Sequence, residues 1–162
     1  MKRIVWIVLF FLCTIASAHA EEPWGLDMPL NTLSGQPIRL ADFKGKVVLI
    51  NFWATWCQPC LGEIPDLIAF QKEYEERGVV VVGVNYMDTS EREELLAFQK
   101  KHNISYPMVF GDPGRIGSLG EFLGGVRGLP TSKLLNREGK PVQSIMGAIK
   151  LENLKKIVDP LL

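Results

Sequence analysis

The chain has 162 residues, of which 47% are hydrophobic and 22% are charged, and its 18 basic residues balance its 18 acidic residues. A chain of this length can bury the core of one domain. The balanced charge and the lack of a basic patch exclude a protein that binds nucleic acid through a positive surface.

The first twenty residues have the features of a secretory signal peptide. Lys2 and Arg3 precede an apolar stretch over residues 4–15, and small residues follow it up to Ala20. We therefore expect cleavage after Ala20, which leaves one domain over residues 21–162 with a small net negative charge. The apolar stretch is shorter than the roughly 20 residues that a membrane-spanning helix needs, and an uncleaved membrane anchor is the alternative.

The mature chain begins with a hairpin pattern. Apolar residues at 30–33 and 37–40 flank the turn residues Ser34-Gly35. A second turn over residues 43–46 leads into the apolar run 47–52, which predicts a central strand.

A pair of cysteines, Cys57 and Cys60, follows this strand and precedes a long helical pattern. At such a place the first sulfur lies at a helix N-terminus, where unpaired backbone N–H groups and the helix dipole stabilise a thiolate. Cys57 is therefore the candidate nucleophile. Cys60, one turn further, is placed to attack the mixed disulfide that Cys57 would form. The sequence thus predicts a thiol–disulfide exchanger.

Two other uses of the cysteine pair are weaker. A structural zinc site needs four ligands, and outside the pair the chain offers only Cys13, His19 and His102. As a structural staple, a disulfide that closes so short a loop would contribute little stability.

The rest of the chain alternates strands and helices. The expected elements are a helix over 59–76 that is kinked at Pro65 and ends at Gly78, a buried strand over 79–84, a helix that begins at a capping box over 90–93, a strand over 106–110, a helix over 116–123, paired strands over 133–136 and 142–148, and a helix over 151–158. Crossover units followed by a hairpin and a helix predict an α/β fold with a central mixed β-sheet flanked by helices.

Two motifs carry a family resemblance. The run GKVVLINFWATWCQPC at 45–60, with Glu63 and Pro65 after it, and the loop Gly128-Leu129-Pro130-Thr131 closely resemble the TlpA-like (ResA/CcmG-type) periplasmic proteins. The resemblance covers nearly the whole mature chain. It implies a thioredoxin-like fold with an N-terminal β-hairpin and a central α/β insertion that begins with the helical segment 90–102. It also implies that Pro130 follows a cis peptide bond and faces the cysteine pair.

Proteins of this family act mostly as dedicated periplasmic reductants, often of apocytochrome c before haem attachment, and a membrane thiol carrier recharges them. The resemblance therefore implies a periplasmic disulfide reductase of cytochrome c biogenesis, with protein disulfides and dithiols as substrates. We expect the Cys57–Cys60 disulfide to be the redox-active group, with no cofactor and no metal. We also expect no nucleic-acid partner and a monomeric protein.

Glu63 is the third candidate catalytic residue after Cys57 and Cys60. It lies one turn beyond Cys60 on the same helix face, within possible reach of a proton transfer to the thiols. The matching family carries at this position a glutamate that is thought to act as acid and base. Asn51 stands where thioredoxin has a buried aspartate, which makes Glu63 the more plausible proton acceptor. The alternative is a solvated helix carboxylate.

The residues expected to bind substrate lie beside or between the two cysteines and in the proline loop. Trp56 would shield the sulfurs from water and offer an apolar contact beside them. A turn at Pro130 would expose backbone groups that can pair with a substrate strand. The expected set is Trp56, Pro59, Leu129, Pro130 and Thr131.

One residue departs from the family pattern. Lys133 stands where the family usually has an aromatic or aliphatic strand residue. We expect a lysine whose stem lies along the surface with its charge in water, and the alternative is a cation that stabilises a nearby thiolate.

Two other functions are compatible with a cysteine pair. A peroxidase of the peroxiredoxin type needs Thr or Ser three residues before its reactive cysteine and a proline earlier in its motif, but this chain has Ala54 and Ile50 there. Two thiolates can also hold Cu(I), as in a copper-delivery chaperone. Related copper carriers use a wider cysteine spacing and a histidine, and His102 falls in the predicted insertion helix.

Overall fold

The structure, a computed structural model, describes residues 25–162. The signal peptide expected over residues 1–20 lies outside the described residues and stays a prediction. In the described part of the chain, no helix has both the length and the apolar character needed to cross a membrane.

The five strands form one mixed sheet in the order β3-β2-β1-β4-β5. Their bounds are β1 Val47–Trp53, β2 Val79–Asn85, β3 Met108–Val109, β4 Thr131–Leu135 and β5 Pro141–Met146. The first three strands run parallel to one another, whereas β4 and β5 add antiparallel pairs. Every residue of β1 and β2 is buried, since helices cover both faces of the centre of the sheet.

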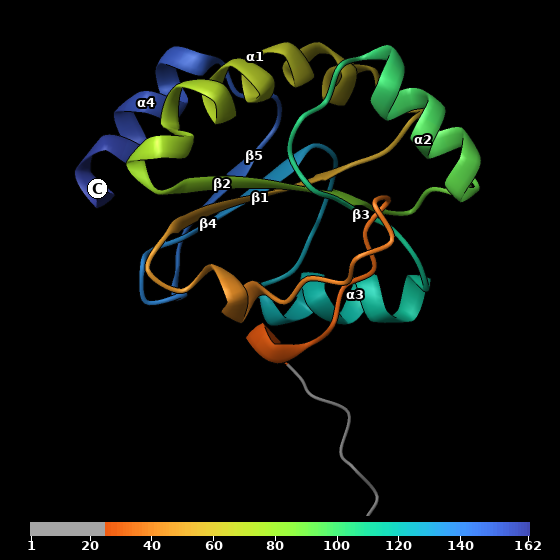
Figure 1. Cartoon of the computed structure of the whole chain (residues 1–162), viewed down its shortest axis with the longest axis horizontal. Helices are drawn as coiled ribbons and strands as arrows, with labels where there is room; N and C mark the ends of the chain where they lie inside the picture. The colour runs from red at the N-terminus through yellow and green to blue at the C-terminus, as the bar shows by residue number, and fades with distance from the viewer. Residues whose placement is uncertain (1–24) are drawn as a thin grey trace, which may run out of the picture.

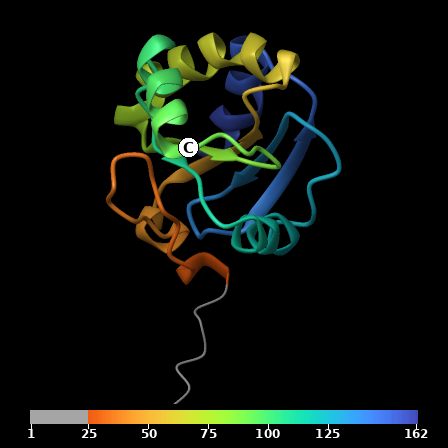
Figure 2. The same ribbon diagram turned by 90° about the vertical axis from the view of Figure 1, so that its right-hand side faces the viewer.

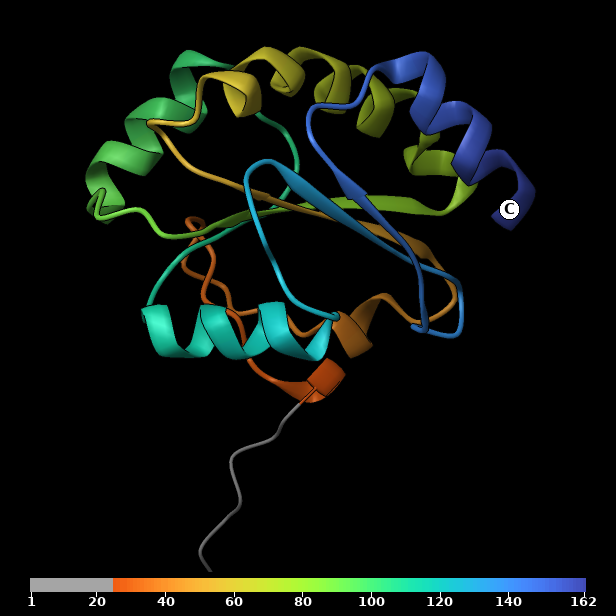
Figure 3. The same cartoon turned by 180° about the vertical axis from the view of Figure 1, so that it is seen from behind.

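Among residues 25–162, four α-helices cover the sheet in two layers, and the mixed α/β sandwich expected from the sequence is confirmed. The helices are α1 Gln58–Tyr74, α2 Arg92–Lys101, α3 Pro113–Phe122 and α4 Leu151–Val158. Helices α1, α2 and α4 lie on one face, and α3 lies on the other together with the N-terminal segment (Figures 1 and 2). The view from behind shows the same two layers (Figure 3). Each layer buries its own apolar cluster against the sheet.

Helix α1 is the element that carries the cysteine pair. Cys57 is its N-cap, and Pro59 stands in its first turn, where its missing N–H costs no hydrogen bond. The helix continues through Pro65, which is exposed. A short 3-10 turn follows, and Gly78 ends it with a left-handed backbone, φ 84°. The sequence pattern placed this helix within one or two residues of its true ends.

The N-terminal hairpin is smaller than predicted. Leu30 and Ile38 exchange two backbone hydrogen bonds, but only as an isolated bridge. Residues Leu40–Phe43 form a 3-10 helix in place of the end of the second strand. The strand expected over 106–110 is likewise reduced to the two residues of β3.

Two helix starts also differ from the sequence pattern. The expected capping box began at Ser90, but the N-cap of α2 is Glu91, whose N–H donates to Glu94 Oε2 at 3.0 Å. The Ser90 side chain does not cap the helix, because its hydroxyl contacts Thr55 Oγ1 at 3.2 Å. Helix α3 begins before residue 116 because Asp112 accepts a hydrogen bond from the Arg115 N–H at 2.8 Å and caps it.

Candidate active site

The cysteine pair forms a disulfide at the point where β1 passes into α1. The S–S bond between Cys57 and Cys60 is 2.04 Å long and the two Cα atoms are 5.2 Å apart. The backbone N–H of Cys60 donates to Cys57 Sγ at 3.3 Å. The sulfur of Cys57 is thus the N-terminal acceptor of the helix, where a thiolate is stabilised.

Both cysteines are buried, and Cys57 keeps slightly more exposure than Cys60. Cys57 is 4% exposed and Cys60 is 0% exposed. Trp56 beside them is 60% exposed, and its indole N–H donates to the backbone oxygen of Met87 at 3.1 Å. Met87 is itself exposed. An apolar surface therefore borders the more accessible cysteine.

Asp88 ties this surface to the segment that leads into the disulfide. Its carboxylate accepts hydrogen bonds from the N–H of Thr55 at 2.6 Å, the amide of Asn85 at 2.9 Å and the N–H of Ser90 at 3.0 Å. Burial by itself would raise the pKa of Asp88, but these hydrogen bonds outweigh it and lower the pKa to about 2. Asp88 is therefore ionised at neutral pH and holds the β2–α2 connection against residue 55.

Glu63 lies on the inner side of α1 and is 1% exposed, so it is not a solvated helix carboxylate. Its Oε1 accepts a hydrogen bond from Asn51 Nδ2 at 2.7 Å, and its Oε2 accepts one from the Ile149 N–H at 3.0 Å. Burial raises the pKa of Glu63, and the two hydrogen bonds oppose this only in part. The result is a buried carboxyl, one helical turn from Cys60, that binds a proton more readily than an ordinary glutamate.

The partners of Glu63 come from distant parts of the chain. Asn51 belongs to β1, and its amide also donates to Ser132 Oγ of β4 at 3.0 Å. Ile149 lies just before α4. Burial raises the pKa of Tyr106, and the charge of Glu63 raises it further. Sequence reasoning noted Asn51 only as a replacement for aspartate, and nothing in the sequence pointed to Ser132 or Ile149.

The proline loop lies at the same end of the sheet as the disulfide. The Leu129–Pro130 peptide bond is cis, as expected. Thr131 pairs with Phe52 in the β1–β4 register, so Pro130 lies at the end of β1 from which the cysteine segment leaves. Leu129 packs against the apolar cluster that contains both cysteines. The loop and the cysteine pair are thus brought together, as the resemblance implied.

Lys133 corrects a sequence prediction. We expected its charge at the surface, but Lys133 is 3% exposed and lies within β4, paired with Ile50 and Ser144. Side chains alternate along a strand, so Lys133 faces the α3 side whereas Ser132 faces Asn51 on the α1 side. None of the interactions found among residues 25–162 joins Lys133 to a cysteine. The prediction of a stem along the surface was wrong, because β4, β5 and the end of α3 enclose the stem, whereas the ammonium reaches a cavity beside these elements.

Peroxide reduction by the peroxiredoxin route needs a hydroxyl three residues before the reactive cysteine, whereas two thiolates alone can hold Cu(I). Ala54 is 0% exposed and has no hydroxyl. The hydroxyl of Thr55 contacts Ser90. In the range 25–162, no group of three or more His, Cys, Asp and Glu side chains is arranged to hold a metal ion.

Known proteins resemble this chain over most of its length. Residues 25–140 match the AhpC/TSA family. Thiol-disulfide oxidoreductase ResA of Bacillus thuringiensis subsp. konkukian is 36% identical over 124 residues, which are 76% of this chain and 68% of the relative.

Solved structures share the fold as well. A thiol:disulfide interchange protein of the thioredoxin family from Chlorobium tepidum TLS has a TM-score of 0.75 and 30% identity, covering 89% of this chain and 99% of that one. A secreted thiol-disulfide isomerase from Corynebacterium glutamicum has a TM-score of 0.73 and 29% identity, covering 83% of each chain. The thioredoxin-like fold expected from the sequence is confirmed by these likenesses.

Proposed function

The chain belongs to the AhpC/TSA family and is a thiol-disulfide oxidoreductase of the ResA type, and from this premise we propose that it reduces disulfides of secreted proteins in the periplasm. The observation that carries the proposal is the disulfide at the N-terminus of α1, with Cys57 at its outer side and Cys60 enclosed. A first cysteine that caps the helix and keeps slight exposure, followed by a fully enclosed second one, suits a nucleophile and a resolving group.

In the reduced protein, the thiolate of Cys57 attacks one sulfur of a substrate disulfide. That S–S bond breaks, the leaving sulfur takes up a proton, and a mixed disulfide joins Cys57 to the substrate. Cys60 then loses its proton and attacks Cys57 Sγ, which releases the substrate as a dithiol and closes the Cys57–Cys60 disulfide. Two electrons pass from the protein to its substrate.

Glu63 is the proposed acceptor of the Cys60 proton. It is buried one turn from Cys60, and its pKa is raised by burial, which brings its basicity closer to that of a thiol. Asn51 and the Ile149 N–H hold both oxygens of the carboxylate in place. Their role would be to position the proton acceptor.

The substrate segment is proposed to lie across the disulfide between two surfaces. One is formed by Trp56 and Met87, which are held together by the indole hydrogen bond. The other is the loop of Leu129, Pro130 and Thr131 at the end of β1. Apolar contact on one side and backbone pairing on the other would bind many sequences around a cystine.

The location and the partners extend the proposal. The signal-peptide pattern of residues 1–20 and the likeness to a secreted isomerase support a place outside the cytoplasm. The resemblance to ResA/CcmG-type proteins supports apocytochrome c as a candidate substrate and a membrane thiol carrier as the electron donor.

The reduction potential tests the direction of electron flow. Gln58 and Pro59 between the cysteines carry no charge, so the structure lacks the cation there that would strongly stabilise the dithiol form. We expect a potential of about −220 to −270 mV in a glutathione titration, toward the thioredoxin end of the known range. A value near about −120 mV would identify an oxidant and contradict the proposal.

A further inference from the structure

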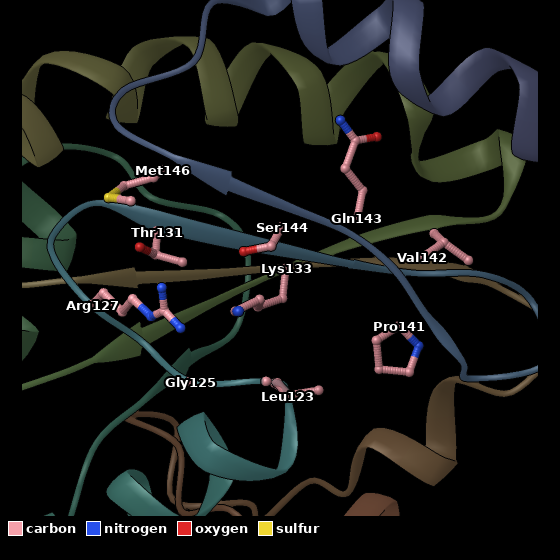
Figure 4. Close-up of a pocket in the computed structure, with 11 residues that line it drawn as sticks. Leu123, Gly125, Arg127, Thr131, Lys133, Pro141, Val142, Gln143, Ser144 and Met146 are labelled. Atoms are coloured by element: carbon pink, nitrogen blue, oxygen red, sulfur yellow. The ribbon is translucent and has the colours of Figure 1, made fainter.

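A second site lies on the face of the sheet opposite α1, at the edge formed by β4 and β5. It is a cavity of about 400 Å³, here called the β4–β5 cavity. Figure 4 shows the side chains around it. Lys133 of β4, Ser144 and Met146 of β5, and Arg127 of the connection after α3 line it together with Gly124 and Gly125, and Figure 4 shows Gly125 at its lower side. A volume of this size falls within the range of sites that bind small molecules.

Two cationic side chains, Lys133 and Arg127, line the cavity, and no acidic side chain of the described chain lines it. Figure 4 shows the ammonium of Lys133 and the guanidinium of Arg127 directed toward one another. None of the residues that line the cavity is Asp or Glu. Within the described chain, no hydrogen bond and no ion pair engages the head group of either cation. Lys133 is 3% exposed as a whole residue, so its side chain is largely enclosed, and its ammonium reaches the cavity without a protein partner among residues 25–162.

This arrangement is unfavourable as it stands. An ammonium on a largely enclosed side chain loses part of its hydration, which a counter-charge or hydrogen bonds would offset. Burial lowers the pKa of Lys133, and the charge of Arg127 lowers it further. An anion between the two side chains would relieve both effects, because it would pair with the ammonium and screen it from the guanidinium.

The C-terminal end of α3 lies close to the Lys133 ammonium and stabilises its charge only in part. A Cβ atom on Gly124 would lie 3.9 Å from Lys133 Nζ, so the ammonium is close to the negative end of the helix dipole. No hydrogen bond from Nζ to a carbonyl of this helix end is present among the described residues. Gly124 has a left-handed backbone, φ 87°, a conformation that favours glycine at this end of the helix.

We propose that the β4–β5 cavity binds an anionic group of the carboxylate or phosphate class between Arg127 and Lys133. The planar guanidinium offers paired donors that match the oxygens of either group, and the ammonium supplies a point charge. The hydroxyl of Ser144, directed into the cavity, is a further donor (Figure 4). Met146 and the other apolar walls leave room for the carbon skeleton that carries the anion.

The anion can come from two sources, a free small molecule or an acidic side chain of the disulfide substrate. The second source rests on the proposed function. Arg127 precedes Pro130 by three residues, a span of at most roughly 11 Å. A substrate held at the Pro130 loop with its cysteine near Cys57 could therefore place an acidic residue, two to four positions from that cysteine, at the cavity mouth.

Thermal unfolding with inorganic phosphate tests the site without any redox step. Sodium chloride keeps the ionic strength constant, so that only specific binding raises the melting temperature. We expect a rise of about 3–5 °C once phosphate exceeds its dissociation constant tenfold. Lys133→Met and Arg127→Gln should each lose most of this rise, and Lys101→Gln, at an exposed lysine of α2, should keep it.

Lys133→Met is expected to fold, because an apolar side chain of similar length removes a buried charge from β4. Arg127→Gln provides a second variant at an exposed position. The measurement uses the oxidised protein and would still detect the site if the protein proved not to be a reductant.

A pair of synthetic cystine peptides distinguishes the sources. The two peptides are identical except for Glu or Gln three residues after the cysteine, and their reduction is followed at several concentrations. A KM at least fivefold lower for the Glu peptide, lost in Arg127→Gln and Lys133→Met, identifies the substrate as the source. Equal KM values with an intact phosphate response identify a free anion. If both assays give the same result for the wild type and for Lys133→Met, the proposal is overturned.

Discussion

Asn51 and Glu63 are joined by a buried hydrogen bond of 2.7 Å from the amide Nδ2 to the carboxylate Oε1. The bond links the central strand to the helix that carries the disulfide. The second carboxylate oxygen is held by the Ile149 N–H, so the orientation of Glu63 is set from two sides. A proton acceptor held in this way needs little rearrangement when the buried thiol ionises.

Glu63→Gln should slow disulfide exchange. The variant keeps the size of the side chain but cannot accept the proton of Cys60, so we expect the rate to fall about 10- to 100-fold and its dependence on pH to change. Insulin reduction and stopped-flow exchange from pH 5 to 9 measure this. An unchanged rate at every pH would leave Glu63 with a structural role only.

The raised pKa of Glu63 should also make the free energy of unfolding depend on pH. Its pKa in the folded protein is raised above the ordinary value of 4.5. A carboxyl with a raised folded pKa contributes most to stability below its unfolded pKa, and this contribution is lost as the pH rises through the folded pKa. The free energy of unfolding of the wild type, relative to Glu63→Gln, should therefore decrease as the pH rises above 4.5. Urea denaturation at a series of pH values checks the sign, and an increasing difference would contradict it.

Asn51→Asp should shift the pH dependence of exchange upward. A second carboxyl at this position replaces a donor to Glu63 with a like charge, so the two groups compete for one proton and the pKa of the pair rises. We expect the pH profile to move by about 1 unit or more. Ser132→Ala is the matched control, because Ser132 contacts the same amide of Asn51 but not the carboxylate. Equal shifts in both variants would point to a general loosening of the strand.

Asp88→Asn should loosen the segment that leads into the disulfide. The pKa of Asp88 is lowered to about 2, so its ionised form stabilises the fold above its unfolded pKa, and this stability is lost as the pH falls toward 2. For a partly exposed carboxylate we expect a loss of about 1–2 kcal/mol at pH 7 that shrinks near pH 2. Glu121→Gln, at an exposed residue of α3, should change little. A loss that stays constant with pH would show that the carboxylate charge is not the cause.

Cys60→Ala should accumulate a mixed disulfide with its substrate. Cys57 remains free to attack, but the buried sulfur that resolves the intermediate is gone. Non-reducing gels and mass spectrometry of proteins trapped in the periplasm would identify the substrate. Cys57→Ala should trap nothing, and equal trapping by both variants would remove the distinction between the two roles.

Local sequence patterns were sufficient for much of the fold. The uninterrupted apolar run of β1 predicts a strand buried on both faces, and the structure has Val47–Trp53 as the central strand. The helical spacing after Cys60 and the stop at Gly78 place α1, because periodicity and a left-handed glycine are local properties. The same holds for α4, which has the predicted bounds. Weak elements were placed less well, since short pairings such as Leu30 with Ile38 depend on their neighbours.

The redox pair, the strand before it and the helix after it follow from local sequence, since those features depend on residues that are adjacent in the chain. The environment of the charged groups follows from tertiary packing. Glu63 is buried against Asn51 and Ile149, which are 12 and 86 residues away. Lys133 is enclosed beside Arg127 because the end of α3 folds back over β4. Burial and charge pairing arise from contacts between distant segments, and a pattern of neighbouring residues does not encode them.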